Sequence, residues 1–236
     1  MRASLVPAYV IHRRAFSETS LILELFTRDY GRVGLLAKGA RRPKSRWAGN
    51  LEPFQLVQVS WTGRGELPTL TGVDLSPSRI RLEGRKIVSG LYLNELIMRL
   101  TARHDAHPEL FEHYGIAVGE LWAADHEEAA LRVFEKRLLD AIGYGLLTHQ
   151  EADTGEAIIA GAQYHYIREF GPSRQSQAGC LVSGGVLLAL EAEQLSSADQ
   201  LREAKRLMRF LLAPHLGEKP LYTRALYQPP VNSRLR

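Results

Sequence analysis

Residues 20–37 read SLILELFTRDYGRVGLLA, and this stretch decides the fold of the N-terminal part of the chain. Its first seven residues are rich in apolar and branched side chains, as in a β-strand. After Thr27, Arg-Asp-Tyr-Gly at 28–31 has the composition of a turn. Beyond the turn, Val33, Leu35 and Ala37 alternate with their neighbours, so one face of a second strand is apolar. The stretch therefore predicts two strands joined by a short turn.

Three further segments of the same kind flank this pair: residues 8–12 (AYVIH), 56–61 and 67–73, the last two joined by a Gly-Arg-Gly turn. Five short strands within about 75 residues leave no room for crossover helices, and so small a sheet must curl to hide its edges. We expect a closed five-stranded barrel of the OB type. An SH3-like barrel fits the same pattern and stays open as an alternative.

Helical spacing replaces the strand pattern from about residue 84. Apolar residues recur at helical spacing from 87 to 98, and Pro108 suits the first turn of a second helix. Asp125 and Glu128 resemble a capping box before a third helix. Ser197 with Gln200 predicts the start of a last long helix, which we expect Pro214 and Gly217 to end. The tail from Gln228 is expected to be frayed.

These patterns together predict an α+β protein. An N-terminal five-stranded OB-fold barrel over residues 1–80 is followed by a mainly helical domain over residues 81–236. A loop-rich insert at about 148–184, rich in Gly, Gln and Ser, contains one strand-like piece at 164–167.

The composition is that of an ordinary globular chain. Its 236 residues are 45% hydrophobic and 24% charged, which excludes a disordered polymer, a coiled-coil rod and a collagen-like chain. The longest apolar runs are far shorter than the ~18 residues of a membrane span, and no signal-peptide pattern opens the chain. The single cysteine, Cys180, excludes an intrachain disulfide and a thiolate zinc cluster. We expect a cytoplasmic protein with no membrane contact and no cofactor.

The positive charge is concentrated in the predicted barrel. Residues 1–80 contain 12 Lys and Arg against 6 Asp and Glu, a net charge of +6, whereas residues 81–236 contain 18 against 20, a net charge of −2. This asymmetry indicates an N-terminal domain that faces a polyanion.

The segment Lys38-Gly-Ala-Arg-Arg-Pro-Lys-Ser-Arg46 has five cations and no acid, between two predicted strands. Such a loop repels itself unless an anion is present, so it favours a groove for a phosphate backbone. Candidates for base stacking are Phe16, Tyr30, Trp47 and Phe54, with the alternative that most of these aromatic residues belong to the core. The cations of the barrel that we expect to contact DNA are Arg13, Arg14, Arg32, Lys38, Arg41, Arg42, Lys44, Arg46 and Arg64.

Catalytic patterns are missing from the sequence. The Gly-Arg-Gly turn lacks the frame of a dinucleotide-binding fingerprint, and no P-loop is present. His104, His107 and His113 lack the further ligands of a metal site. No nucleophile elbow or pair of acids stands out. The residues indicate binding rather than catalysis, with no metal.

Two helices carry basic stripes. On the third helix, Arg132 and Lys136 flank an apolar stripe that includes Leu131, a pattern that suits an acidic and hydrophobic peptide end. A salt-bridged surface with Glu128 paired to Arg132 is the alternative. On the last helix, Lys205, Arg206 and Arg209 form a second basic stripe, for which a solvated face is the alternative.

The order and spacing of several short segments resemble the RecO family of bacterial recombination mediators. These segments are residues 17–20 (SETS), 31–33 (GRV), 37–41 (AKGAR), 90–96 (GLYLNEL), the region from Arg132 to Gly145, 204–206 (AKR), and 216–221 (LGEKPL) with Arg224. Together they cover roughly residues 8–227, and no single segment is diagnostic.

The resemblance implies a DNA repair factor without enzymatic activity. RecO-like proteins combine an OB-fold with a helical domain, bind single- and double-stranded DNA, and anneal complementary strands. They recognise the C-terminal tail of the single-stranded-DNA-binding protein SSB. With RecR, and in some settings RecF, they help load RecA onto SSB-coated DNA. The resemblance assigns Lys38, Arg41 and the loop to Arg46 to DNA and Arg132 to the SSB tail. It implies a cytoplasmic, nucleoid-associated protein.

The chain departs from the family pattern at one place. Many members carry a four-cysteine zinc module after the central helix, but Thr148-His149-Gln150 occupies the expected position of the first cysteine pair. We therefore expect the cysteine-poor branch of the family, without zinc. An OB-fold RNA-binding protein, or a nucleic-acid hydrolase that uses the same basic groove, is the alternative. Two-metal hydrolysis of a phosphodiester needs several carboxylates, and the absence of an acid cluster from this sequence argues against the hydrolase.

Overall fold

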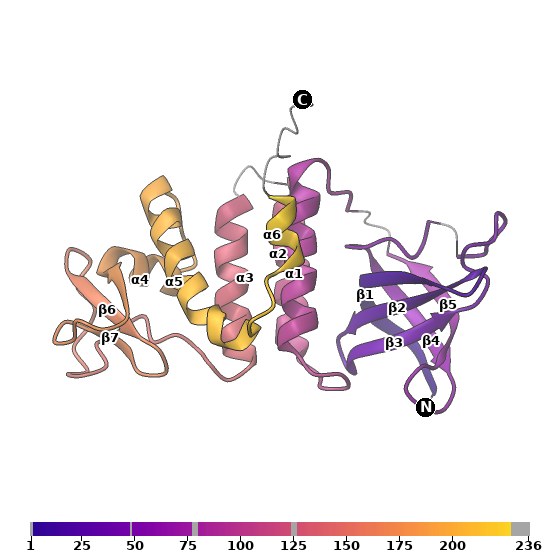
Figure 1. Cartoon of the computed structure of the whole chain (residues 1–236), viewed down its shortest axis with the longest axis horizontal. Helices are drawn as coiled ribbons and strands as arrows, with labels where there is room; N and C mark the ends of the chain where they lie inside the picture. The colour runs from indigo at the N-terminus through magenta and orange to yellow at the C-terminus, as the bar shows by residue number, and fades with distance from the viewer. Residues whose placement is uncertain (1, 48, 77–79, 124–126, 228–236) are drawn as a thin grey trace, which may run out of the picture. The chain divides into compact units, whose positions relative to one another are not determined.

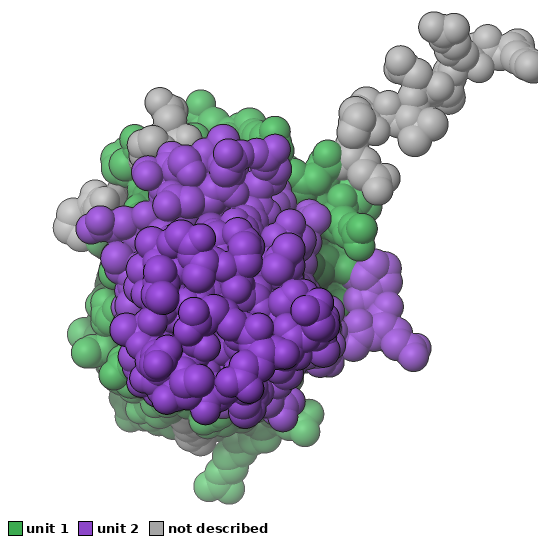
Figure 2. Space-filling view, turned by 90° about the vertical axis from the view of Figure 1, so that its left-hand side faces the viewer, with its two compact units in different colours: residues 1–123, 221–236 green, residues 124–220 purple. Residues whose placement is uncertain are grey.

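The computed structural model describes residues 2–47, 49–76, 80–123 and 127–227 (Figure 1). Two compact units make up the chain (Figure 2): residues 1–123 with 221–236, and residues 124–220. The predicted boundary at residue 80 concerns folding domains rather than these compact units, so it stays a prediction. None of the described helices is long and apolar enough to cross a membrane.

Five strands of the first unit form a closed barrel in the order β1-β2-β3-β5-β4 (Figure 1). All neighbouring pairs are antiparallel except β3 and β5, which close the ring as a parallel pair at Leu36 and Thr69. This confirms the predicted OB-like barrel. The strands are β1 Arg2–Phe16, β2 Ser20–Thr27, β3 Gly31–Ala37, β4 Leu56–Thr62 and β5 Thr69–Leu75.

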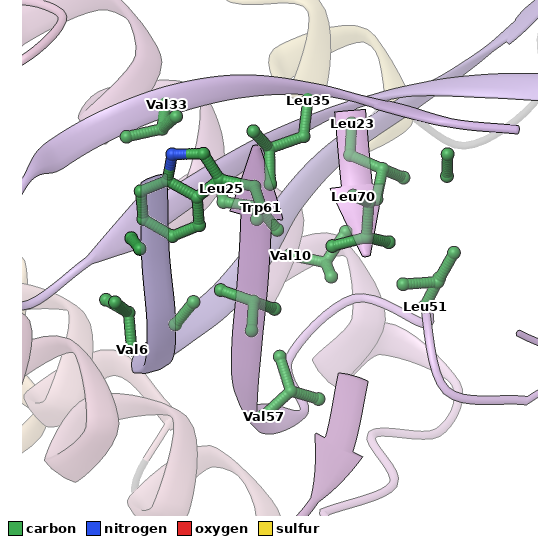
Figure 3. Close-up of a cluster of buried hydrophobic side chains, with 14 of the residues drawn as sticks. Val6, Val10, Leu23, Leu25, Val33, Leu35, Leu51, Val57, Trp61 and Leu70 are labelled. Carbon is green, nitrogen blue, oxygen red and sulfur yellow. The ribbon is translucent and has the colours of Figure 1, made fainter. Parts of the chain in front are cut away.

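Apolar side chains from every strand fill the barrel interior (Figure 3). Val33, Leu35 and Ala37 are fully buried, as their alternation predicts. Trp61 is fully buried in this core and packs edge-on against Tyr30, with ring centroids 5.2 Å apart. Burial of apolar area at about 25 cal/mol per Å² is the main favourable contribution to such a small barrel.

The turn between β2 and β3 requires glycine at one position. Gly31 has φ +61°, and a Cβ there would lie 1.9 Å from the carbonyl oxygen of Asp105. Thr27 closes the turn, because its hydroxyl donates to the carbonyl of Gly31 and accepts from the backbone N–H of Tyr30. The barrel and the backbone around Asp105 are therefore in close contact.

The described residues of the first unit also form the helices α1 Arg85–Leu100, α2 Pro108–Ala123 and α6 Tyr222–Leu226. Tyr9 of β1 packs against Phe111 and Tyr114 of α2 at centroid distances of 5.1 and 4.8 Å. The buried Asn94 of α1 donates to the carbonyl of Ile11 and accepts from the Tyr114 hydroxyl. Complete burial raises the pKa of Tyr114 well above its ordinary value. Apolar packing and paired polar groups thus join barrel and helices.

The second unit combines helices with a small sheet in the order β7-β6-β8. Ser197 and Gln200 form the predicted capping box of α5. The predicted strand-like piece of the insert is the central strand, β6. The elements are α3 Glu127–Ala141, β6 Gln163–Ile167, β7 Gly171–Ser173, β8 Cys180–Ser183, α4 Gly184–Glu191 and α5 Ala198–Leu216.

The structure adds one helix to the predicted elements of this unit and corrects the end of another. The short apolar helix α4, capped by Ser183, has no counterpart among the predicted elements. Pro214 does not end α5, which continues to Leu216. A proline inside a helix cannot donate to the carbonyl four residues earlier. Here the guanidinium of Arg168 donates to that carbonyl, at Phe210, over 3.0 and 3.1 Å. The expected cap at Asp125 and the expected frayed tail lie outside the described residues.

Candidate nucleic-acid interface

The basic segment, residues 38–46, follows β3 directly and forms successive turns. The backbone N–H of Arg42 donates to Gly39, and that of Ser45 donates to Arg42. Gly39 has φ +70°, a conformation that favours glycine. The backbone N–H of Arg41 donates to the carbonyl of Thr19 over 2.8 Å. The segment is therefore fastened to the turn between β1 and β2.

Trp47 anchors the far end of the basic segment in the barrel. Its side chain is only 5% exposed and belongs to the hydrophobic core. The indole N–H donates to the carbonyl of Lys38 over 3.1 Å, so the two ends of the segment are tied together. The guanidinium of Arg46 lies 4.0 Å from the centroid of the indole ring. Trp47 is one of the predicted candidates for base stacking, but its burial leaves the ring no exposed face for that role.

Strand register brings three predicted contact regions to the C-terminal end of β3. Arg14 of β1 is paired with Ile22 of β2, which is paired with Leu36 of β3. Adjacent strands lie ~4.8 Å apart, so Arg14 is about two strand spacings from Leu36. The backbone N–H of Leu36 donates to Pro68, in the β4–β5 turn that carries Arg64. Arg14, the basic segment and the Arg64 turn are therefore neighbours.

Most cations at this end of the barrel, which we call the basic surface, have no acidic partner among the described residues. Lys38, Arg41, Arg42, Lys44 and Arg46 are all exposed, and none forms an ion pair with the described residues. Arg14 and Arg64 are likewise exposed without an ion pair there. Arg13 is the exception, because it pairs with Glu52 at 2.6 Å. Like charges held together repel, and a polyanion relieves that repulsion.

Arg32 has a different environment from the other predicted contacts. It pairs with Phe26, toward the opposite end of β3, and its side chain is only 12% exposed. Its guanidinium donates to the carbonyl of Thr101 and to the carboxylate of Glu24. Burial lowers the pKa of Arg32, and Glu24 offsets only part of that shift. Because these hydrogen bonds use the guanidinium of Arg32 within the first unit, Arg32 is not part of the proposed interface.

Sequence reasoning missed Arg2 as a neighbour of this surface. Arg2 is exposed and pairs with Thr62, next to the turn that carries Arg64. Its isolated position at the start of the chain gave no signal, and only strand pairing reveals the proximity.

The predicted basic stripe of α5 is largely occupied within the second unit. Lys205 forms an ion pair with Glu128 at 2.6 Å. The guanidinium of Arg206 donates to the carbonyl of Leu181. Arg209 is exposed and has no ion pair among the described residues. Of the three predicted contacts, Arg209 is the one that keeps a free charge in the described part of the chain.

The residues predicted to bind the SSB tail are buried. Leu131, Arg132 and Lys136 are 5%, 3% and 7% exposed. Arg132 pairs with Glu135 at 2.8 Å rather than with Glu128, which pairs with Lys205. The structure thus does not place Arg132 on an open helix face, because its side chain is buried together with its partner Glu135.

Lys136 is buried beside an acid from the segment after α4. Glu193 accepts from Lys136 at 3.1 Å and from Arg137 at 2.5 Å. Burial acts to raise the pKa of Glu193, but the bonds from the two cations outweigh it, and the pKa lies below its ordinary value. Glu193 therefore occupies the place that another carboxylate would take on these cations.

A cavity of about 340 Å³ lies in the second unit, between the end of α3, β6 and the end of α5. Tyr144 and His215 lie at its wall with ring centroids 4.0 Å apart. Tyr166 also lines it, and burial raises the pKa of its hydroxyl to about 12. In the described ranges, no three His, Cys, Asp or Glu side chains are grouped as metal ligands.

Both parts of the chain match known protein families. Residues 1–79 match the family described as Recombination protein O N terminal, and residues 81–225 match Recombination protein O C terminal. The chain belongs to the RecO family. Membership confirms the expectation of a DNA repair and recombination mediator rather than an enzyme.

Relatives support this assignment over nearly the whole chain. The chain is 47% identical over 232 residues to the DNA repair protein RecO of Alkalilimnicola ehrlichii, covering 96% of this chain and 92% of the relative. It is 44% identical over 231 residues to that of Nitrosococcus oceani, with coverage of 97% and 94%. It is 45% identical over 227 residues to that of Halorhodospira halophila, with coverage of 94% and 95%.

The buried pair on α3 makes a testable prediction about stability. Arg132→Ala should lower the free energy of unfolding by ~3–5 kcal/mol, because it removes the cation that pairs with the buried carboxylate of Glu135. Urea denaturation monitored by circular dichroism measures this change. Arg202→Ala is the matched control, since Arg202 forms an exposed pair with Asp199 at the same helical spacing. That variant should lose at most ~1 kcal/mol. Equal losses in the two variants would contradict the structural role of Arg132.

Proposed function

We propose that this chain binds single- and double-stranded DNA through the basic end of its barrel and anneals complementary strands. The observation that carries this proposal is the basic segment, five exposed cations without an ion pair in the described residues, fastened to an OB-like barrel. Arg13, Arg14 and Arg64 extend the same surface, and Arg209 is a further contact on the second unit.

The mechanism is electrostatic. Contacts to phosphates hold a strand without reading its sequence. Cations that neutralise phosphates on two strands lower the repulsion between them, so base pairing can proceed without ATP. The free energy for annealing comes from the base pairs themselves, and the protein lowers the barrier to encounter.

The second part of the proposal concerns protein partners. With RecR, and in some settings RecF, the chain would help load RecA onto SSB-coated DNA at the nucleoid in the cytoplasm. Binding of the SSB tail would raise the local concentration of the barrel at the DNA. The support for these partners is family membership.

For the SSB tail we propose contacts at Lys136, with Leu131 and Arg132 on the preceding turn. An acidic tail would compete with Glu193 for Lys136, since a carboxylate already occupies that cation. The Arg132–Glu135 pair would have to open before the tail reached Arg132.

We also propose that the chain acts without zinc, as a member of the cysteine-poor branch. Cys180 is buried in the strand β8, and four thiolates cannot be assembled from one cysteine. The insert is held instead by hydrogen bonds and by apolar contacts of Tyr164 and Val182.

Binding to single-stranded DNA should depend strongly on salt. If about five phosphates are neutralised, the slope of log K against log salt should be roughly −3.5, from ~0.7 per phosphate. Replacing Arg41, Arg42 and Lys44 by Ala together should flatten the slope by about 2. Fluorescence anisotropy with labelled oligonucleotides at several salt concentrations gives both slopes.

The control for this measurement removes the same charge elsewhere. Arg85, Arg202 and Arg224 are exposed residues of helices, and their replacement by Ala should leave the slope unchanged. A slope that is the same for the wild type and the basic-segment variant would show that this segment does not contact the DNA.

Annealing should need neither ATP nor a divalent ion. Two complementary labelled oligonucleotides, mixed with the protein in EDTA, should pair faster than without it, and the triple variant of the basic segment should lose this acceleration. Energy transfer between the two labels follows the reaction. Annealing that EDTA abolishes and a divalent ion restores would contradict an electrostatic mechanism.

Substitutions around Glu193 test the tail site. Glu193→Gln should strengthen binding of a labelled peptide with acidic residues before a terminal apolar residue, because a competing carboxylate is removed. Lys136→Ala should weaken it roughly tenfold to over a hundredfold, from ~1.5–3 kcal/mol for a charge-assisted hydrogen bond. Glu156→Gln removes an exposed carboxylate that pairs with Arg174 and serves as the control. An unchanged affinity in Glu193→Gln would exclude this site.

A further inference from the structure

Phe16 is an exposed aromatic residue within the basic surface of the barrel. The described part of the barrel, residues 2–47 and 49–76, contains seven aromatic side chains. Phe16, at 45% exposure, is the only exposed one among them. An isolated exposed apolar side chain is common and needs no explanation by itself. The surroundings of Phe16 are what distinguish it.

The side chains of the other candidates for base stacking are packed against the hydrophobic core or buried. Phe54 is buried, and a Cβ on Gly90 would lie 2.7 Å from its ring. Tyr30 packs against Trp61 in the barrel core, and Trp47 closes the basic segment. Within the described barrel, Phe16 is thus the aromatic residue with a ring exposed enough to meet a ligand.

The backbone around Phe16 is fixed by the basic segment. Phe16 ends β1 and pairs with Ser20 across the turn. Ser17 follows with φ +48°. The guanidinium of Arg41 donates to the carbonyl of Ser17 over 3.3 Å, and the backbone N–H of Arg41 donates to the carbonyl of Thr19. A ring on such a fixed turn loses little freedom when a ligand stacks on it.

Two cations without an ion pair among the described residues flank Phe16. Arg14 lies two residues before Phe16 on the same strand, and Arg41 contacts the turn that follows it. Neither has an acidic partner among the described residues. Glu18 of the turn is the nearest acid in the sequence. A phosphate backbone held by the basic segment would therefore pass the ring at close range.

We infer that Phe16 stacks on an unpaired base of single-stranded DNA bound along the basic segment. The inference rests on the proposed DNA binding and names a residue that would make the protein prefer single-stranded over double-stranded DNA. Bases in a duplex are already stacked on each other and present no free face, whereas an unpaired base does. Stacking on an aromatic ring tolerates any base, which suits a protein that anneals strands of every sequence.

Abasic DNA provides the test, because it keeps the phosphates and removes the bases. The wild type should bind oligo-dT more tightly than an abasic oligonucleotide of equal length. Phe16→Ala should weaken binding of oligo-dT about 5- to 150-fold, the range equivalent to ~1–3 kcal/mol per stacked base. Its affinity for the abasic strand and for duplex DNA should not change, and its salt slope with oligo-dT should remain that of the wild type.

A tryptophan at the same position reports on stacking directly. Trp47 and Trp61 are buried, and Trp122 is 51% exposed on α2. In a Trp122→Phe background, the fluorescence of Phe16→Trp should be quenched by oligo-dT and not by the abasic strand. Trp122→Ala, which removes an exposed aromatic ring outside the barrel, should bind every DNA like the wild type.

The outcomes separate this inference from the proposed function. Salt-dependent binding of the wild type to all three DNAs, with Phe16→Ala unchanged on oligo-dT, would overturn the stacking role and leave the basic surface intact. An equal loss on oligo-dT, abasic and duplex DNA would also overturn it, because the ring would then act only on the backbone path. Absence of salt-dependent binding in the wild type would instead contradict the proposed function itself.

Discussion

Closure of the barrel between β3 and β5 is the constraint on which the proposed interface depends. The two strands pair in parallel at Leu36 and Thr69, and the backbone N–H of Leu36 reaches Pro68 just before β5. This short contact converts a curled sheet into a ring without a free edge at that point. It also brings the β4–β5 turn beside the end of β3, where the basic segment starts. Without closure, Arg64 and Lys38 would belong to separate ends of an open sheet.

The distribution of acids decides which cations are available to a polyanion. Arg32 and Arg132 lie beside Glu24 and Glu135, are largely buried, and hold their own unit together. A buried cation without its partner is costly, so such residues are fixed in place. The basic segment has no acid of its own, and its cations stay solvated and unpaired among the described residues. The same residue type thus serves internal structure in one place and binding in another.

Rigidity of the basic segment follows from the side chains at its two ends. Trp47 gives the segment a hydrophobic anchor in the core, and Arg41 ties it to the β1–β2 turn through backbone and side-chain bonds. Anchors of this kind lower the entropy that a loop loses when it binds. They also place Phe16 and the cations on one continuous surface, so that charge and aromatic contact act on the same strand.

The five strands, the α+β class, the position of the basic segment and the family were all predictable from the amino-acid sequence. These features depend on local periodicity, turn composition and the order of short segments, which are readable without coordinates. Tertiary structure alone decided the partners of each charged side chain, since Glu24, Arg32 and Thr101 meet only after folding. It likewise separated Phe16 from Trp47 and Phe54, which have similar chemistry and differ in burial. Burial and pairing are properties of contacts between distant residues, and a single sequence contains no direct record of those contacts.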